Sequence, residues 1–411
     1  MKKLFYMFAL VGAVMLTACD PNELTPQGDK TKLWFAGVDG EDVGGFINAD
    51  GKMVIPAKYW FNYYNIFHFG YVDLPQFSCG WACVWDEEES CYVYIDKDGK
   101  AGNTDEDYVL YTFYYNYAPF EDNTTGKEGM FDKDLKVAIP ADYYYLSMMG
   151  DNELCYFKEN AGDKYGYLDK NGKVAIEPDF DDAYDFLGGI AKVVVIKNSV
   201  EYYGIIDGKG NYLIDLQKKY IYNVGEGLVG FMNTNGKYGL WDKKGNEVLP
   251  ATYDDLWGFS CGLSMVKKNG KYGYINTKGE VEISLSYQSA NPFYDDIAWV
   301  FKNDRWEAIN KKGESLFKLK DNETYLTCFH NGLALVLNTD NYEFRYVNKE
   351  GKPVYKWTHE PEGEPEMPLR RAIPTTEKEH NEQILRMLEG TEYYPLFCEK
   401  MGIKREKKTK H

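Results

Sequence analysis

Residues 272–279 read Tyr-Gly-Tyr-Ile-Asn-Thr-Lys-Gly, and nearly the same phrase occurs at residues 165–172 and 238–245. Each copy has an aromatic residue, Gly, two apolar residues, Asp or Asn, two polar residues and a second Gly. Successive turn positions lie 34 to 38 residues apart after a first interval of 48, so the chain is predicted to contain about nine tandem units. Fainter copies place the turn residue at Gly51, Gly99, Leu135, Gly210, Gly313 and Gly351.

The second half of the phrase is typical of a β-hairpin turn. The Asp or Asn side chain can bond the turn backbone, and the Gly that follows can take the left-handed conformation that closes the loop. Gly279 is therefore predicted to have a positive φ. The apolar runs on either side are predicted strands, and the later strand often ends at a proline, as at Pro56, Pro140 and Pro250.

A second phrase follows each turn and completes the unit. An aromatic residue, two further residues, Gly, and an apolar-small-apolar run occur at residues 186–193, 259–266 and 329–336. A polar turn such as residues 267–270 then leads into the next Tyr-Gly pair. Each unit is thus predicted to be a three-strand meander.

The Gly after each Tyr has a predicted packing role. Gly weakens a strand unless something must approach the backbone closely, and an aromatic ring from a neighbouring strand would do so. The tyrosines of these pairs are therefore interpreted as packing residues, with an exposed aromatic stripe for ligand binding as the alternative. They are Tyr165, Tyr203, Tyr238 and Tyr272.

These patterns predict an all-β fold of tandem three-strand β-hairpin or meander repeats. The expected arrangement is an open solenoid-like array in which each repeat covers the apolar face of the next. A closed propeller-like ring is the alternative, although nine copies exceed the usual range of about four to eight blades.

The start of the chain has the features of a secretion signal. Lys2 and Lys3 precede an apolar run at residues 4–16, which is too short to span a bilayer. The sequence Leu-Thr-Ala-Cys that ends at Cys19 resembles the bacterial lipobox. Residues 1–18 are therefore a predicted signal peptide, Cys19 a predicted lipid anchor and residues 19–32 a polar tether. These features predict a membrane-anchored lipoprotein of the cell envelope, held in the outer membrane at its periplasmic face or at the cell surface.

The end of the chain differs from the repeats. Residues 358–411 begin with a Glu- and Pro-rich linker, could form one short helix at residues 376–388, and end in a basic tail at residues 404–411. The whole chain has a formal net charge of −17 and a pI of about 4.9. An acidic protein repels phosphate backbones, so nucleic acid is not an expected partner.

No set of residues predicts catalysis or metal binding. The five histidines lack metal-ligand spacing, and no nucleophile elbow or phosphate-binding loop occurs. Residues 96–99 begin like a calcium loop but lack its closing Glu. The adjacent acids at residues 181–182, 254–255 and 295–296 are interpreted as turns or solvated loops. No catalytic residue, metal ligand or cofactor is therefore predicted.

The repeats at residues 33–357 resemble the WG repeat family, also called KWG repeats. Tyr-Gly mostly stands here where the family has Trp-Gly, and Trp306 is followed by Glu307. The resemblance implies an all-β repeat array, often lipid-anchored or secreted, with no shared catalytic activity and no functional residues to carry over.

The expected function is a lipid-anchored envelope module that binds or scaffolds other envelope proteins through its repeat surface and is not an enzyme. The contact is expected at the irregular, aromatic-rich residues 59–120, unless these only cap the first repeat. The alternative is a glycan-binding module. A row of exposed aromatic rings would favour glycan, and buried rings would favour protein.

Overall fold

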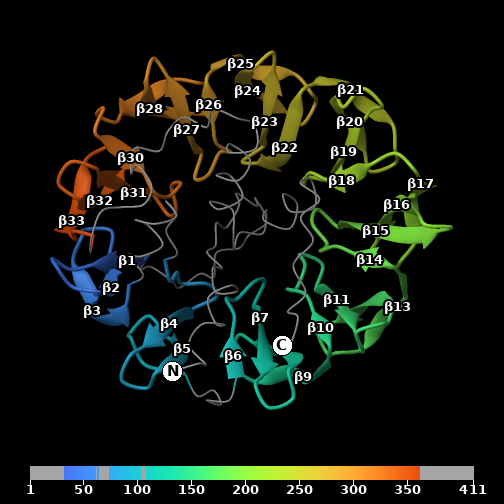
Figure 1. Cartoon of the computed structure of the whole chain (residues 1–411), viewed down its shortest axis with the longest axis horizontal. Coiled ribbons are helices and arrows are strands. Elements are labelled where there is room, and N and C mark those ends of the chain that lie inside the picture. The colour runs from blue at the N-terminus through green and yellow to red at the C-terminus, as the bar shows by residue number, and fades with distance from the viewer. Residues whose placement is uncertain (1–31, 62, 64–73, 103–107, 362–411) are drawn as a thin grey trace.

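The computed structural model describes residues 32–61, 63, 74–102 and 108–361. Their strands form eight sheets, one of five strands and seven of four. The sheets stand side by side around a ring, and the last sheet lies beside the first (Figure 1). Among the described residues, no helix combines the length and apolar character needed to cross a bilayer.

The strand bounds follow in chain order. The first sheet contains β1 (Trp34–Gly37), β2 (Val43–Ile47), β3 (Met53–Trp60), β4 (Ala82–Asp86) and β5 (Cys91–Ile95). The next two contain β6 (Tyr108–Leu110), β7 (Tyr117–Asp122), β8 (Lys127–Asp132) and β9 (Val137–Tyr143), then β10 (Tyr145–Leu146), β11 (Leu154–Lys158), β12 (Tyr165–Asp169) and β13 (Val174–Phe180). Then come β14 (Asp182–Ala183), β15 (Ile190–Lys197), β16 (Val200–Asp207) and β17 (Tyr212–Gln217). The fifth sheet contains β18 (Ile221–Asn223), β19 (Leu228–Met232), β20 (Tyr238–Asp242) and β21 (Glu247–Tyr253), and the sixth contains β22 (Asp255–Ser260), β23 (Leu263–Lys268), β24 (Lys271–Asn276) and β25 (Val281–Tyr287). The chain closes with β26 (Ser289–Ala290), β27 (Ile297–Lys302), β28 (Arg305–Asn310) and β29 (Ser315–Lys318), then β30 (Glu323–Tyr325), β31 (Leu333–Asn338), β32 (Glu343–Asn348) and β33 (Pro353–Thr358).

Each four-stranded sheet has one strand more than the predicted meander. Strands adjacent in sequence pair antiparallel, and the first strand of each sheet lies nearest the ring centre (Figure 1). This first strand has six residues in β22 but three in β6, β18 and β30 and only two in β10, β14 and β26. A strand of that length shows no alternation of apolar and polar residues, so the sequence pattern could not reveal it.

The predicted turns are all present. Gly279 has φ +79°, which confirms the left-handed conformation, and Asn276 Oδ1 accepts from the N–H groups of Lys278 and Glu280 at 3.0 and 3.1 Å. Leu135, which stands where the other copies have Gly, has φ +58°. Nine turns fit into eight sheets because the five-stranded sheet carries two of them; its β3 and β4 are joined through a single residue pair, Tyr59 with Asp86.

The Gly of the Tyr-Gly pair lies opposite a β-bulge. Tyr165 pairs with Phe180 and Tyr167 with Ile176, so the outer strand has two extra residues opposite Gly166. A Cβ on Gly166 would lie 2.7 Å from the Ile176 carbonyl oxygen and 3.0 Å from the ring of Phe157. The expected ring contact is therefore present, but the bulged backbone comes closer. The bulge bends the outer strand, and only Gly leaves room for it.

The ring is closed by contacts between its first and last sheets. Tyr346 in β32 donates through its hydroxyl to the carbonyl of Phe35 in β1 at 2.7 Å. One buried cluster contains both Phe35 and Phe46 from the first sheet and both Phe344 and Trp357 from the last. The expectation of an open array is therefore wrong, and the closed ring is confirmed. Both ends of the array are apolar, so each buries the other where an open array would need polar capping repeats.

Candidate interaction face

The two sides of the ring carry different loops. Because the strands of a sheet alternate in direction, the nine repeated turns, from the turn at Gly51 to the turn at Gly351, all lie on one side, here called the turn face. The opposite side, here called the hairpin face, carries the loops that join β1 to β2, β4 to β5, β7 to β8, β11 to β12, β15 to β16, β19 to β20, β23 to β24, β27 to β28 and β31 to β32. The last strand of each four-stranded sheet also ends there.

Six lysines on the hairpin face lie along four neighbouring sheets, from β14 to β29. They come from the β15–β16, β23–β24 and β27–β28 loops and from the connection between β17 and β18. All six are exposed, and no ion pair joins them to any carboxylate in the described part of the chain. We call this group the lysine crescent: Lys197, Lys218, Lys219, Lys268, Lys271 and Lys302.

Aromatic rings support the ammonium groups of the crescent. Lys268 lies 5.5 Å from the ring centre of Tyr253, and Lys302 lies 5.7 Å from that of Tyr287. In both cases the ring ends the last strand of the preceding sheet. Lys219 lies 4.8 Å from the ring centre of Trp241. A cation over an aromatic face is attracted to it, so these contacts hold the charges in place at the surface.

The other side of the hairpin face is acidic. The β1–β2, β4–β5 and β7–β8 loops carry exposed or half-buried carboxylates, here called the acidic sector: Asp39, Glu41, Asp42, Glu87, Glu88, Glu89 and Asp122. In Figure 1, β4 and β5 lie on the opposite side of the ring from β23 and β24. The hairpin face therefore has a positive and a negative half.

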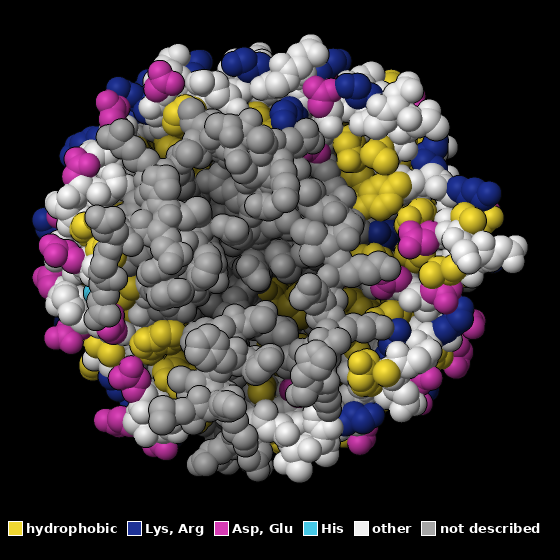
Figure 2. Space-filling model, viewed as in Figure 1, with side chains coloured by type: hydrophobic (Ala, Val, Ile, Leu, Met, Phe, Trp, Pro, Cys, Tyr) yellow, Lys and Arg dark blue, Asp and Glu magenta, His cyan; other side chains and the backbone are white. Residues whose placement is uncertain are grey.

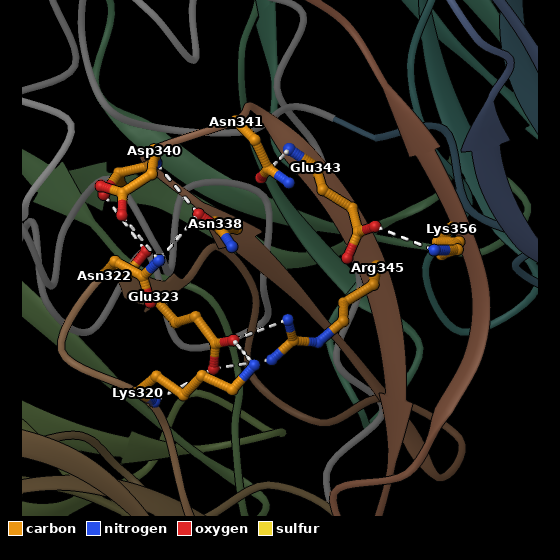
Figure 3. Close-up of polar contacts among 10 residues, drawn as sticks. Lys320, Asn322, Glu323, Asn338, Asp340, Asn341, Glu343, Arg345 and Lys356 are labelled. Atoms are coloured by element: carbon orange, nitrogen blue, oxygen red, sulfur yellow. Dashed lines mark hydrogen bonds and ion pairs between the residues drawn. The ribbon is translucent and has the colours of Figure 1, made fainter.

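A polar cluster lies on the last sheet, β30–β33 (Figure 3). This sheet stands between β26–β29 and β1 in the ring (Figure 1). Arg345 donates to Glu323 Oε1 at 2.8 Å, and its other nitrogen lies 2.7 Å from Glu323 Oε2. Only 2% of the Glu323 side chain is exposed. Burial raises the pKa of Glu323, but the bonds from Arg345 and from the Lys320 N–H outweigh it and leave the pKa below its usual value. This carboxylate is a structural anion.

Hydrogen bonds across the surface complete this cluster. Asn322 Nδ2 donates to Asp340 at 2.8 Å and to Asn338 at 3.2 Å, while Lys356 pairs with Glu343 at 3.0 Å (Figure 3). The Asn322 bonds join the end of β31 and the β31–β32 loop to the connection that precedes β30, and the Lys356–Glu343 pair joins β32 to β33. The cluster therefore connects the strands of the last sheet next to the crescent.

On the turn face, acidic side chains join adjacent sheets. Asp151 accepts from the N–H of Gly188, Glu226 from Gly262 at 3.1 Å, and Asp295 from Gly332. The acceptor and donor of each bond lie 36 or 37 residues apart, one repeat along the chain. These acids therefore clamp neighbouring repeats together.

The adjacent acids singled out in the sequence have two kinds of surroundings. Asp295 and Asp296 have φ of +54° and +63°, so that pair is a turn, as expected. Asp255 is instead buried in β22, which differs from the expected solvated loop. Its neighbour Asp254 accepts from Lys237 and from the N–H of Asn269, and the Lys237 bond is the largest cause of its lowered pKa. Asp254 therefore joins the β19–β20 loop of one sheet to the β23–β24 loop of the next.

Other sequence predictions have these outcomes. Cys19, the short helix at 376–388 and the basic tail at 404–411 lie outside the described residues. His330 is buried beside the seam, where burial lowers its pKa to about 4. Asp96 Oδ1 accepts from the N–H groups of Asp98 and Lys100, both at 2.9 Å, in a hairpin turn. In the described ranges, no three His, Cys, Asp or Glu side chains are grouped to hold a metal ion.

Most aromatic rings pack inside the ring of sheets. Tyr272 is buried, and Tyr165, Tyr203 and Tyr238 are half-buried against core clusters, as their packing role predicts. Within the irregular segment, Tyr59 and its neighbours Phe61 and Tyr63 are buried too. Figure 2 shows one side of the molecule, where Lys, Arg, Asp and Glu side chains are spread around the rim.

The sequence analysis missed the lysine crescent. A signal was present in the Lys-rich residues 267–271, which were interpreted only as a turn. The crescent runs from Lys197 to Lys302, so its first and last members are more than a hundred positions apart in the chain. Only the ring places them along one arc.

A closed ring of tandem antiparallel sheets, with the first strand of each sheet innermost, defines the chain as a β-propeller. Its residues 45–59, 165–195, 238–272 and 272–306 match the model of the WG containing repeat. The chain is therefore a WG repeat-containing protein. No curated protein matches its sequence.

Several solved structures are similar to the chain. A computationally designed protein, Ika8, is 13% identical over 80% of this chain and 96% of its own, with a TM-score of 0.36. AztD from Citrobacter koseri is 10% identical over 82% of this chain and 96% of its own, also with a TM-score of 0.36. One of two prolyl endopeptidases analysed together is 12% identical over 68% of this chain and 53% of its own, with a TM-score of 0.39. The similar structures thus include peptidases, at identities and TM-scores too low to indicate an activity.

Proposed function

We propose that this protein is a lipid-anchored interaction module of the cell envelope that binds another protein through its hairpin face and catalyses no reaction. The lysine crescent carries this proposal. Its six exposed lysines have no carboxylate partner within the described residues, although the chain as a whole is acidic. A cluster of exposed charges of one sign can steer and orient a partner of the opposite sign.

The surroundings of the aromatic rings favour a protein over a glycan. Sugar rings bind to exposed aromatic faces, and among the described residues Tyr212 is the one aromatic in the group of clearly exposed large hydrophobic side chains, at 39% exposure. At the crescent, the lysine ammonium groups cover the ring faces. A sugar would have to displace them before it could stack.

Crosslinking in intact cells tests the binding function. The variant Lys268→Glu/Lys271→Glu/Lys302→Glu reverses three charges of the crescent. Its control, Lys243→Glu/Lys244→Glu/Lys278→Glu, makes the same charge change in turns of the opposite face. The crescent variant is expected to lose the crosslinked partner, while the control retains it. Equal recovery with both variants, each shown to be folded, would contradict the proposal.

The anchor is a separate part of the proposal. Cys19 is the cysteine that follows the apolar run at the Leu-Thr-Ala-Cys position. Cys19→Ala is expected to abolish fatty-acid labelling and release the protein from the membrane fraction. A Cys398→Ala variant serves as the control, because this cysteine lies outside the repeats. Continued labelling of the Cys19→Ala chain would show that the anchor assignment is wrong.

A further inference from the structure

We propose that the protein bound by the hairpin face is a second copy of this chain, so that two rings associate face to face. This inference rests on the proposed function and names its partner. The hairpin face carries both halves of a charge pair, with the lysine crescent between β14 and β29 and the acidic sector between β1 and β8. A surface with both halves can be its own partner.

The arrangement of the two halves fits a two-fold interface. Strands β4 and β5 lie across the ring from β23 and β24 (Figure 1). The loop of the first pair carries residues 87–89, and the second pair carries Lys268 and Lys271 at its loop. A two-fold axis in the plane between two facing rings, perpendicular to the line from acid to base, brings each acidic sector over the partner's crescent. Such isologous interfaces, in which the same surface serves both subunits, are the commonest form of homodimer.

The three glutamates of the β4–β5 loop and the six lysines of the crescent are all exposed. No ion pair is present for Glu87, Glu88 or Glu89, nor for the six lysines of the crescent, within the residues that the structure describes. The cation–π contacts already fix the positions of five of these lysines, so less side-chain freedom is lost on association. Exposed charges of this kind are available for pairing between molecules.

The net charge of −17 does not prevent this association at physiological salt. Ions screen charges that are separated by more than about 8 Å, so the repulsion between whole molecules is weakened. Opposite charges that meet at the interface are closer than this and are screened much less. Association is therefore expected to require moderate ionic strength and to weaken again in high salt.

The anchoring membrane is a poorer fit for this face. The first strand, β1, begins at Trp34, whose indole N–H donates to the carbonyl of His330 in a loop of the turn face. The chain before β1 therefore joins the ring at the turn face. The hairpin face is on the other side of the ring from this attachment point.

A charge-exchange experiment on the full chain in detergent tests the proposal. One variant, Lys268→Glu/Lys271→Glu/Lys302→Glu, reverses the charge of the crescent at the β23–β24 and β27–β28 loops. The other, Glu87→Lys/Glu88→Lys/Glu89→Lys, reverses the charge of the β4–β5 loop. Sedimentation equilibrium of each variant alone is expected to show a dimer weakened on the order of 100-fold relative to the unchanged chain, because like charges then meet at both contacts.

Mixing the two variants supplies the decisive result. In a mixed dimer the reversed loops of one variant meet the reversed loops of the other with opposite charge, so dimer formation is expected to return to within about tenfold of the unchanged chain. This recovery also shows that both variants are folded. The control variant Lys243→Glu/Lys244→Glu/Lys278→Glu on the turn face is expected to dimerise as the unchanged chain does.

The outcomes separate this inference from the proposed function. A monomeric unchanged chain, or a mixture that stays monomeric, overturns the inference. If such a chain still captures a different protein in cells through its crescent, the proposed function stands without it. If it neither dimerises nor captures another protein, both are overturned.

Discussion

The indole N–H of Trp34 donates a hydrogen bond to the main-chain carbonyl of His330 at 2.8 Å, although 296 residues separate the two. Trp34 begins the first strand, and His330 lies in the loop between β30 and β31 of the last sheet. The bond is buried and joins the two ends of the repeat array. A single substitution at Trp34 can therefore test how much this bond contributes to closing the ring.

Trp34→Phe is expected to lower the free energy of unfolding by about 1–3 kcal/mol, because the buried His330 carbonyl loses its donor while most of the apolar contact is kept. Trp241→Phe is a suitable control, since Trp241 is half-buried and its ring packs on Phe231 within one sheet. Urea denaturation measures both. An equal loss in the two variants would mean that the Trp34 bond contributes little to closure.

His330 is expected to make the seam sensitive to acid. Burial lowers its pKa to about 4, whereas an unfolded histidine titrates near 6.5. Between pH ~6.5 and pH 4, His330 is protonated in the unfolded chain but stays neutral in the folded chain. The free energy of unfolding therefore falls as the pH drops through this window. The full effect is at most about 3 kcal/mol.

The variant His330→Gln removes this titration and keeps a polar side chain. Urea midpoints between pH 7 and pH 4.5 are expected to fall less steeply for His330→Gln than for the unchanged chain. The carboxylates that also titrate near the lower limit are common to both proteins and cancel in the comparison. Identical slopes would argue that His330 is not held neutral in the ring.

Alanine substitutions at two glycines can separate the effect of a left-handed backbone conformation from the effect of steric overlap. A Cβ on Gly236 or on Gly162 would meet no atom within 4 Å, but Gly236 has φ +70° and Gly162 lacks a positive φ. Gly236→Ala is expected to cost about 1–2 kcal/mol, because L residues resist the left-handed region. Gly162→Ala is expected to be neutral or to stabilise by up to ~1 kcal/mol through the unfolded state.

Thermal melts of the two alanine variants check this difference in sign. Gly102 would be a poor control although it lies outside the turns, because a Cβ there would overlap the side chain of Leu135. Equal effects at Gly236 and Gly162 would show that the turn conformation does not limit stability.

The sequence predicts the local parts of this fold better than their assembly. The Asn276–Gly279 turn could be predicted because its side-chain bonds span only two and four residues. Closure could not, since it depends on contacts such as Tyr346 with Phe35, 311 residues apart. The spacing of repeats fixes how many units there are but not the angle between them, and that angle decides between a ring and an open array.

The lysine crescent could not be predicted from the sequence for the same reason, because it too depends on how distant segments are arranged. Each lysine of the crescent occupies an ordinary loop position, and nothing near Lys197 in the sequence relates it to Lys302. The positive half exists only because consecutive sheets turn their hairpin loops to one side. The burial of Tyr59, by contrast, agrees with the alternative that the irregular aromatic residues cover the first repeat.

The ion pair of Arg345 with Glu323 is expected to be far costlier to break than to replace. Arg345→Met leaves a carboxylate that is 2% exposed with Lys320 as its remaining cationic partner among the described residues, at 3.4 Å. Removing one member of a buried pair costs about 3–5 kcal/mol, and Lys320 should reduce the loss toward the lower value. The double variant Glu323→Leu/Arg345→Met removes both charges and is expected to lie within about 1–2 kcal/mol of the unchanged chain.

The pH dependence of this pair has a definite sign. The pKa of Glu323 is lowered in the folded chain, so the pair stabilises it above the ordinary Glu value near 4.5 and less as the pH falls through the folded pKa. The deficit of Arg345→Met is therefore expected to be largest at pH 7 and to shrink towards pH 4, where the carboxyl can bind a proton. Lys356→Met, which removes a cation that is 67% exposed, should cost under about 1 kcal/mol at either pH. Urea denaturation of these variants at both pH values measures the cycle, and a deficit for Arg345→Met that stays constant with pH would mean that Glu323 is not held as a buried anion.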